Sequence, residues 1–283
     1  MSRWRRAAHR LVNSRWGTPL RPLHRAAVAT MLAAVGERDR RRFAAPPDER
    51  LAREVTLTVK TFERPDALAR HLRTARRVFA GRIVVADDSR VPWTSDDPDV
   101  EVVALPFNSG VSKGRNAALD RVRTPFVLVC DDDIVFTHGT DWTLALDYLD
   151  RNPDVDGVAA TLIELPGWYS NVTPPDPLLR GHAEPRRAHG ELVDGLPVNL
   201  KPPQVYLART ESTRSIRWNE ELRMMDHNDF MSRASGRLVF VQDPDIACFH
   251  ARTPWNRFYT RHREDIAADK RVLGRLWNSR RTA

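Results

Sequence analysis

Three consecutive aspartates, Asp131, Asp132 and Asp133, follow an apolar run in the stretch FVLVCDDDIVF. The apolar run predicts a buried strand, and carboxylates at its end need a cation or hydrogen bonds to offset their charge. In extended geometry Asp131 and Asp133 point to the same side. Two such carboxylates form a site for Mg²⁺ or Mn²⁺ that also takes phosphate oxygens. Asp132 then faces away and is available to hydrogen-bond a sugar hydroxyl.

The same aspartates fit a second chemistry. The letters DDDIV satisfy D-x-D-x-[TV], the pattern of the haloacid-dehalogenase phosphotransferases. There the first aspartate attacks phosphorus and the second acts as acid and base. The motif alone does not separate the two interpretations. Position favours the metal site, because that family normally opens its core domain with this strand, whereas here three strands and two helices are predicted before it.

The elements that must position the aspartates follow from hydrophobic spacing. Alternating, β-branched segments predict strands, and apolar residues three and four apart predict helices. The predicted order is a strand at 54–62, a helix at 64–79, strands at 82–89 and 100–106, a helix at 109–122 and a strand at 125–133. This order indicates an α/β fold of three layers with a mostly parallel central sheet.

Polar residues stand at the carboxyl ends of three of these strands. The segments are KTFER after the first strand, DDS after the second and DDD after the last. In open α/β sheets ligands bind beyond the carboxyl ends of the strands. Acids gathered there beside Lys60, Arg64 and Arg115 predict a site for a phosphorylated ligand that is carried with a metal.

The second half of the chain is less regular. A helix is predicted at 141–153 and a strand at 155–165, and residues 165–204 are rich in proline, glycine and histidine. So long an irregular segment is usually a functional loop or a disordered one. Further strands are predicted at 204–210 and 237–250, on either side of a segment that becomes helical before residue 235.

Charge divides the 283 residues into three parts. The formal net charge of +8 combines +9 over residues 1–53, −7 over 54–251 and +6 over 252–283. We therefore expect a basic helical N-terminal extension, with helices at 3–16 and 22–43 and a linker at 44–50, a central domain at 54–251, and a basic C-terminal tail at 252–283. The basic ends suit an anionic membrane surface; loose contact with nucleic acid and solvated tails are the alternatives.

The motifs in combination resemble a known family. The segments VTLTVKTFERP, RIVVADDS, NSGVSKGRN and FVLVCDDDIVF are similar to those of family 2-type glycosyltransferases with the GT-A fold. The resemblance is closer to the β-1,4-N-acetylgalactosaminyltransferases of ganglioside synthesis, and it continues through MDHNDF and DPDIACFH to cover roughly residues 55–251. It implies an inverting transfer from a UDP-sugar, such as a UDP-N-acetylhexosamine, to an acceptor hydroxyl with Mn²⁺ or Mg²⁺.

The resemblance also implies roles for individual residues. Asp229 falls where the family places its general base, and Asp226, three residues earlier, is a second candidate. Asp131 and Asp133 match the metal-binding D-x-D, and His250 matches a histidine that completes the metal shell in some relatives. The residues expected to contact the donor are Thr61, Arg64, Asp87, Asp88, Asn108, Gly110, Arg115, Asn116 and Asp132. Which of Asp87 and Asp88 contacts the base is open.

Several expectations rest on what the sequence lacks. The loop KTFERPD contains no glycine, which disfavours a sugar-phosphate nucleotidyltransferase; a non-catalytic, basic surface-binding protein is the remaining alternative. Two cysteines without a disulfide framework favour a reducing compartment, and no apolar run approaches the roughly 20 residues of a membrane span. We expect a bacterial, cytoplasmic enzyme, peripheral at the inner face of the membrane, with a glycan, lipid-linked or small-molecule acceptor and no nucleic-acid partner.

Overall fold

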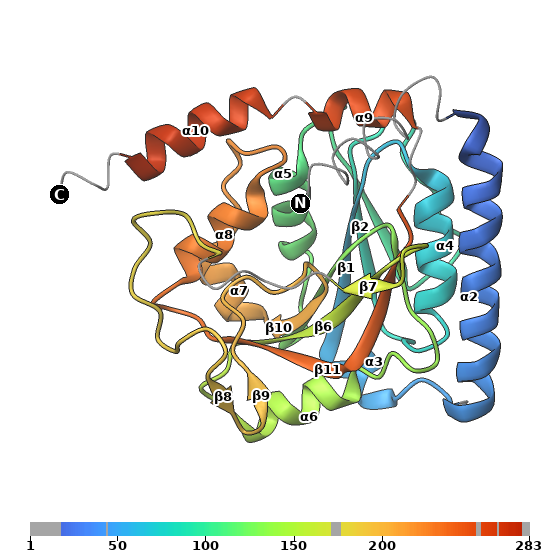
Figure 1. Cartoon of the computed structure of the whole chain (residues 1–283), viewed down its shortest axis with the longest axis horizontal. Coiled ribbons are helices and arrows are strands. Elements are labelled where there is room, and N and C mark those ends of the chain that lie inside the picture. The colour runs from blue at the N-terminus through green and yellow to red at the C-terminus, as the bar shows by residue number, and fades with distance from the viewer. Residues whose placement is uncertain (1–17, 44, 171–176, 253–255, 265, 279–283) are drawn as a thin grey trace.

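A nine-stranded sheet forms the centre of the molecule in the computed structural model (Figure 1), which describes residues 18–43, 45–170, 177–252, 256–264 and 266–278. The strand order is β3-β2-β1-β4-β10-β6-β11-β5, and β7 pairs with β6. The strands are β1 Val55–Thr61, β2 Ile83–Asp87, β3 Val100–Ala104, β4 Phe126–Asp131, β5 Ile134–Val135, β6 Gly157–Glu164, β7 Tyr169–Ser170, β10 Tyr206–Arg209 and β11 Phe240–His250.

Most of the sheet runs in one direction. Strands β3, β2, β1 and β4 are mutually parallel, and β10 lies antiparallel between β4 and β6. Because β6 pairs in parallel with β11, both run in the direction of β4, while the short β5 and β7 run against it. This confirms the mostly parallel sheet that the sequence predicts.

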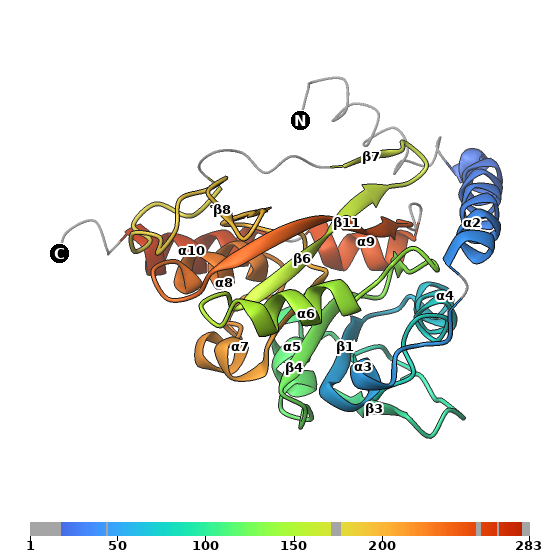
Figure 2. The ribbon, with the colours of Figure 1, turned by 90° about the horizontal axis from the view of Figure 1, so that it is seen from below.

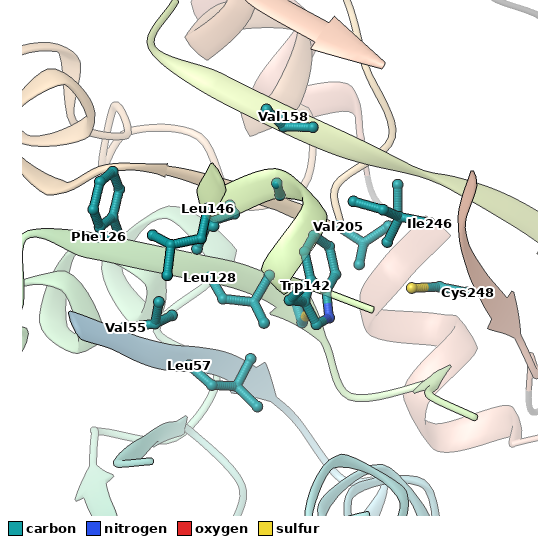
Figure 3. Packing of buried hydrophobic residues seen from close by; sticks show 14 of the residues in the cluster. Val55, Leu57, Phe126, Leu128, Trp142, Leu146, Val158, Val205, Ile246 and Cys248 are labelled. Carbon is teal, nitrogen blue, oxygen red and sulfur yellow. The ribbon is translucent and has the colours of Figure 1, made fainter. Parts of the chain in front are cut away.

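Helices cover both faces of the sheet (Figures 1 and 2). Residues on β4 alternate between two cores: Leu128 packs with residues of α3, α4 and α6, as Figure 3 shows in part, whereas Val127 and Val129 pack with residues of α5, α7 and α8. This period of two is what a strand buried on both faces requires. The helices are α3 Glu49–Glu54, α4 Pro65–Ala75, α5 Val111–Leu119, α6 Thr143–Arg151, α7 Thr210–Ile216 and α8 Asp226–Ala234.

The parallel register brings the carboxyl ends of three strands together. Lys60 near the end of β1 is paired with Asp131 at the end of β4, and Thr61 is paired with Asp87 at the end of β2. The polar residues that follow these strands therefore meet at one edge of the sheet, as the sequence predicts.

The described part of the N-terminal extension packs on the central domain. Helix α2, Arg21–Phe43, confirms the helix predicted at 22–43, after a short 3₁₀ turn η1 at Thr18–Leu20. Its Val28 is buried against Val135 and Phe249. The helix predicted at 3–16 lies outside the described residues. The predicted linker is shorter than expected, because Asp48 caps α3 by accepting the backbone N–H groups of residues 50 and 51 at 2.8 and 3.0 Å.

The C-terminal segment, which the sequence predicts as a basic tail, contains two helices. Helix α9, Arg257–Glu264, and helix α10, Ala267–Asn278, lie along the edge of the molecule near α5 and α8 (Figure 1). Leu273 and Trp277 of α10 pack with Leu222 in a small core of their own. The charge pattern alone does not predict these two helices, because it does not register the apolar residues of α10 that stand between the charged ones.

The remaining described segments are short. Residues 177–204 contain a small separate ribbon of β8, Leu192–Val193, and β9, Leu196–Pro197, and are otherwise largely irregular, in agreement with the sequence. In the described part of the chain, no helix is both long enough and apolar enough to cross a lipid bilayer.

Candidate functional site

A cavity of about 280 Å³ opens at the ends of β1 and β2. Of the predicted donor-contact residues, Thr61, Asp88, Asn108 and Gly110 line it. The backbone at Gly110 has a φ of 101°, a conformation that glycine adopts without strain, and this residue directly precedes α5 as its N-cap. Asp88 accepts the Gly110 N–H at 2.9 Å. The predicted loop and helix start therefore do form one wall of a cavity.

Lys60 stands on the floor of this cavity as a buried cation. Its ammonium group is ion-paired with the Asp88 carboxylate and also donates to the Thr61 carbonyl. Gly114 on α5 makes this possible, since a Cβ atom there would lie 2.0 Å from Cδ of Lys60. A buried lysine beside a helix start suits a phosphorylated ligand.

Asp87 points elsewhere. Its carboxylate accepts the backbone N–H groups of Ser89 and Trp93, at 2.8 and 2.7 Å, and so holds the loop that follows β2. It lines a different, neighbouring cavity. The structure thus separates the two aspartates that the sequence leaves open: Asp88 lies in the cavity beside Lys60, and Asp87 shapes the loop.

The aspartate triplet departs from extended geometry, because β4 ends at Asp131 and the next two residues form a turn. Asp132 is fully buried (0% exposed) and accepts the Thr61 hydroxyl at 2.7 Å. The Arg64 guanidinium binds both Asp132 and Asp133, the latter at 2.6 Å. The expectation that Asp132 faces away from its neighbours towards a sugar is therefore corrected: in this structure its carboxylate is held inside the protein.

The electrostatics follow from this burial. Burial raises the pKa of Asp132 to about 6, against the opposing effect of the Arg64 charge. Burial also acts to raise the pKa of Asp133, but the charges of Arg64 and His250 outweigh it and hold that pKa well below its usual value. Arg64 thus offsets the charge of two aspartates.

Arg115 holds the third aspartate. Its guanidinium binds Asp131 at 2.7 Å and the Gln204 side chain at 2.9 Å, and its Nε lies 3.3 Å from the Asp226 carboxylate. One buried arginine, Arg115, therefore links Asp226 at the start of α8 to Asp131 of the aspartate triplet. About a third of the Asp131 side chain (32%) remains exposed, so this carboxylate is accessible to a ligand.

Asp229, one turn further along α8, faces other partners. Its two carboxylate oxygens accept the Arg233 Nε–H at 2.7 Å and the Trp277 indole N–H at 3.0 Å, and the side chain is 1% exposed. The two candidate bases thus point into different surroundings. Asp226 lies against the arginine that binds Asp131, and Asp229 anchors the C-terminal helix α10.

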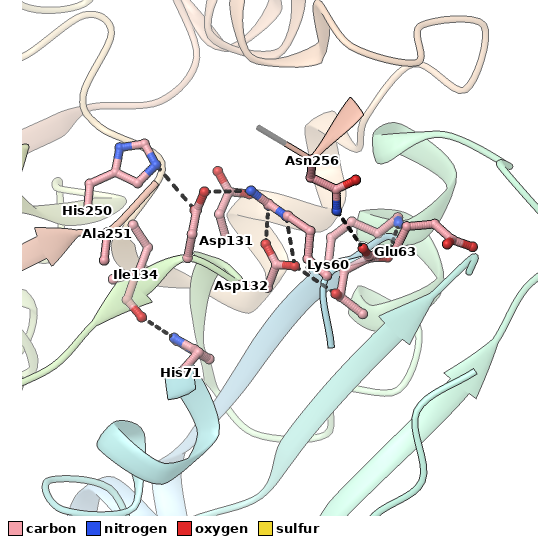
Figure 4. A network of polar contacts seen from close by, with 12 residues as sticks. Lys60, Glu63, His71, Asp131, Asp132, Ile134, His250, Ala251 and Asn256 are labelled. Atoms are coloured by element: carbon pink, nitrogen blue, oxygen red, sulfur yellow. Dashed lines mark hydrogen bonds and ion pairs between the residues drawn. The ribbon is translucent and has the colours of Figure 1, made fainter. Parts of the chain in front are cut away.

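His250 ends β11 beside the triplet. Asp131 and Asp132 lie together at the strand end in Figure 4, with His250 on one side and Lys60 on the other. The His250 Nε2 lies 3.2 Å from Asp133, and its Nδ1 lies 2.9 Å from Glu164. Burial acts to lower the pKa of His250, but the two carboxylates raise it to about 9.

These residues fit a divalent cation. Among the described residues no three His, Cys, Asp or Glu side chains are already assembled as a metal site. However, a histidine oriented by a carboxylate on its other nitrogen is the usual form of a metal-ligating histidine, and Glu164 orients His250 in this way. Magnesium and manganese are commonly held by one or two carboxylates and completed by substrate phosphates, which is the donor set that Asp131 and Asp133 offer.

Asn116 is placed differently from the expected donor contact. Its side-chain amide donates to the Trp218 carbonyl at 2.8 Å and accepts the Trp218 N–H at 2.9 Å. It is buried and does not line the cavity. Its role in this structure is to fix the segment between α7 and α8 to α5.

The sequence reasoning missed the cavity's outer wall. Arg223 and Met224, before α8, and Arg261 and His262, from α9, complete the lining. The α9 aromatic residues also pack on the loops of the site: the His262 ring lies 5.5 Å from the ring of Phe62. The available signal is the set of aromatic residues interleaved with arginines in RFYTRHRE, a segment that the charge pattern alone assigns to the tail.

Asp269 on α10 fixes the loop before α8. Its carboxylate accepts the backbone N–H groups of Arg223, Met224 and Met225 at 3.1, 2.7 and 2.8 Å. This loop leads directly to Asp226. The C-terminal helices therefore position both the cavity wall and the start of the helix that carries the candidate bases.

Comparison with known proteins gives consistent matches. Residues 58–175 match the family described as "Glycosyl transferase family 2". Human "Beta-1,4 N-acetylgalactosaminyltransferase 1" is 34% identical over 214 residues, which are 71% of this chain and 40% of the human protein. Mouse "Beta-1,4 N-acetylgalactosaminyltransferase 2" is 30% identical over 216 residues, 74% of this chain and 41% of the relative. The chain therefore spans about two fifths of the length of these relatives.

Solved structures share the fold. The structure of S. aureus TarS 1-349 aligns with a TM-score of 0.51 and 17% identity over 69% of this chain and 60% of TarS. GalNAc-T7, solved with UDP, GalNAc and Mn²⁺, aligns with a TM-score of 0.52 and 11% identity over 72% of this chain and 44% of its own. These neighbours establish the GT-A fold.

Proposed function

We propose that this chain, a family 2-type glycosyltransferase with the GT-A fold, catalyses an inverting, metal-dependent transfer of a sugar from a UDP-sugar to an acceptor hydroxyl. The proposal rests on one observation. The cavity at Asp88 and Lys60 and the carboxylates of Asp131 and Asp133 lie at the same edge of the sheet. A nucleoside diphosphate needs a pocket and a cation that compensates its charge, and at this edge the cavity lies beside two carboxylates that would hold a metal ion.

The donor nucleotide would occupy the 280 Å³ cavity. Asp88 and Asn108 offer hydrogen-bond partners for the base and ribose, and Lys60 and the start of α5 favour the diphosphate. TarS has been solved with UDP and GalNAc-T7 with UDP and Mn²⁺, which supports a uridine nucleotide here. The acetylgalactosaminyltransferase names of the curated relatives support a UDP-N-acetylhexosamine as donor.

Asp131, Asp133 and His250 would hold the metal. A bound Mn²⁺ or Mg²⁺ would neutralise charge on the diphosphate leaving group. Arg64 and Arg115 bind the carboxylates in this structure, and a diphosphate bound there would offer them further oxygen partners, since guanidinium groups bind carboxylate and phosphate alike. Glu164 keeps the His250 ring in place.

An inverting transfer needs a carboxylate on the acceptor side. The acceptor oxygen attacks the anomeric carbon, the bond to the diphosphate breaks, and the hydroxyl proton passes to the base. We assign the base to Asp226, because it lies in the polar network of Asp131, whereas both oxygens of Asp229 are bound by Arg233 and Trp277. Asp229 is then a positioning residue for α8 and α10.

The test of the donor site is a thermal-shift panel of nucleotides and nucleotide-sugars, with and without Mn²⁺. We expect stabilisation by one UDP-sugar that depends on Mn²⁺ and is lost in Asp131→Ala. The matched control is Asp154→Ala, which removes an exposed aspartate far from the site in sequence. If no UDP-sugar stabilises the protein, or if Asp131→Ala keeps the metal-dependent effect, the proposed donor site is wrong.

The test of the base compares Asp226→Asn with Asp229→Asn at saturating donor. Asp226→Asn should lower turnover by on the order of 10²-fold or more, the scale of a positioned general base, while UDP binding is retained. Asp229→Asn should chiefly lower the temperature of unfolding. The reverse pattern, with near-normal turnover in Asp226→Asn, would return the role of base to Asp229.

A further inference from the structure

A second cavity, of about 240 Å³, lies between the N-terminal helix α2 and the start of α4. Figures 1 and 2 show the two helices lying beside each other. The cavity shares no lining residue with the one assigned to the nucleotide. It is smaller than the roughly 300–1,000 Å³ of most small-molecule pockets, so it suits one group of a larger ligand.

The lining of this cavity is strongly basic. Five arginines and a histidine face one acid, Asp66. The basic residues are Arg21, His24, Arg25, Arg64, Arg70 and Arg252. Three of the arginines have acidic partners: Arg64 binds Asp132 and Asp133, Arg252 binds Glu164, and Arg25 lies 3.6 Å from Asp66 on the surface.

The other two arginines form no ion pair with a carboxylate among the described residues, although Arg70 lies in the field of Asp132 and Asp133. Arg70 donates to the Ala251 carbonyl at 2.7 Å, and its buried Nε has no hydrogen-bond partner among the described residues. Arg21, the first residue of α2, has no acidic partner within the described part of the chain. A guanidinium held by a neutral carbonyl inside a cavity is a site where an anion gains charge-assisted hydrogen bonds.

The cavity borders the reaction edge. Arg64 contributes to its wall and at the same time binds the aspartates beside the metal position. Arg252 contributes to the wall and binds Glu164, which orients His250. An anion in the cavity could therefore contact Arg64, the same arginine that binds the carboxylates at which the donor diphosphate would bind.

We propose that the cavity between α2 and α4 binds an anionic group, phosphate or carboxylate, of the acceptor substrate. The assignment to the acceptor rests on the proposed transfer reaction; the anion site itself rests only on the arginines. In this arrangement α2 is part of the substrate site, and the acceptor reaches the sheet edge from the side of Arg64, through a cavity separate from that of the nucleotide.

The experiment measures binding of three probes by calorimetry: inorganic phosphate, methyl β-glucuronide and, as its neutral counterpart, methyl β-glucoside. Wild-type protein should bind the two anions and not the glucoside. Arg70→Gln and Arg21→Gln should each weaken anion binding about tenfold, equivalent to about 1.4 kcal/mol. The matched control is Arg73→Gln, which removes an exposed arginine of the same helix outside the cavity and should leave anion binding unchanged.

Binding of UDP with Mn²⁺ is measured on every variant as an independent readout. Retention of UDP binding in Arg70→Gln, together with weaker anion binding, supports the inference. If UDP fails to bind even the wild type while the anions bind, the proposed donor is wrong but the anion site stands. Equal anion binding in Arg70→Gln and Arg73→Gln overturns the site.

Vesicles separate an acceptor from a lipid headgroup as the source of the anion. Vesicles of phosphatidylcholine alone and vesicles with about one fifth phosphatidylserine are compared for wild type and Arg70→Gln. Equal association of both proteins with the anionic vesicles supports a soluble or glycan-borne anion. Loss of vesicle binding in Arg70→Gln without any binding of the soluble anions would overturn the acceptor assignment in favour of a headgroup.

Discussion

The sheet edge and the terminal helices are held by different kinds of contact. At the edge, the charges of the aspartate triplet are compensated by two buried arginines, Arg64 and Arg115, within hydrogen-bond distance. The terminal helices attach through small apolar cores and single carboxylates. Val28 of α2 and Trp277 of α10 each pack in such a core, while Asp39 of α2 and Asp269 of α10 accept backbone N–H groups of neighbouring loops. Buried ion pairs concentrate where the ligand is expected, and apolar cores with isolated carboxylates hold the elements around it.

The two regions meet at a few polar contacts. Asp269 of α10 accepts three backbone N–H groups of the loop before α8, and Trp277 donates to Asp229. The difference between the regions predicts different responses to mutation. A change at the edge leaves buried charges unpaired, whereas a change in the terminal helices removes hydrogen bonds and alters the site only through the loop.

The largest effect is expected for Arg64→Met. This change leaves Asp132 and Asp133 buried without their main cation, and breaking a buried ion pair by removing one partner costs about 3–5 kcal/mol. The free energy of unfolding, measured by urea denaturation in the absence of metal, should fall by that amount. Mn²⁺ should restore part of it, because a cation between the carboxylates replaces the lost charge.

Arg64→Lys is the control that keeps a positive charge but not the planar guanidinium group. Its free energy of unfolding should lie between those of the wild type and Arg64→Met. Unchanged stability of Arg64→Met would mean that the edge tolerates unpaired aspartates. The contrast between the edge and the terminal helices would then be lost.

The sequence predicts the edge well because its signals are local. The alternation around Leu128 and the polar residues after each strand lie within a few positions of one another, and the parallel register then brings them together. The turn at Asp132 escapes prediction, because a run of three aspartates looks the same in a strand and in a turn. The predicted parallel sheet places Arg64 near the acids, but its direct pairing with Asp132, 68 residues away, has no sequence signal.

The attachment of the C-terminal helices could not be predicted for a related reason. Trp277 lies 48 residues from Asp229, and Asp269 lies 44 to 46 residues from the N–H groups that it accepts. A single aspartate or tryptophan in a basic helix has no periodic pattern that identifies its partner.

The source organism is not settled by the relatives. The human and mouse relatives are animal proteins, so the expectation of a bacterial enzyme stays a prediction.

An intermediate effect is expected for Asp269→Ala. The change leaves three backbone N–H groups without their acceptor, and an unpaired buried group costs about 1–3 kcal/mol. Because the loop can relax towards water, we expect a total loss of about 3 kcal/mol in the free energy of unfolding. Arg223 and Met224 of this loop line the nucleotide cavity, so UDP affinity should fall about tenfold, or about 1.4 kcal/mol.

Lys270→Ala, at the exposed neighbouring position on α10, is the control and should change neither quantity. A loss of stability without any loss of UDP affinity would show that the loop keeps its shape without α10. The contact of Asp269 on α10 would then not be needed to shape the donor site.

The smallest effect is expected for Trp277→Phe, which removes one indole N–H from Asp229 and keeps an aromatic ring against Leu222 and Leu273. A hydrogen bond to a charged group contributes about 1.5–3 kcal/mol, and Arg233 still binds the other oxygen, so we expect a loss at the lower end of this range. Turnover should change by no more than about threefold if, as we propose, Asp226 and not Asp229 takes the proton. Trp168→Phe, which removes an indole from a half-exposed tryptophan outside this network, is the matched control for measuring both quantities. A drop in turnover of on the order of 10²-fold in Trp277→Phe, with stability unchanged, would place Asp229 in the chemistry and make α10 part of the catalytic edge.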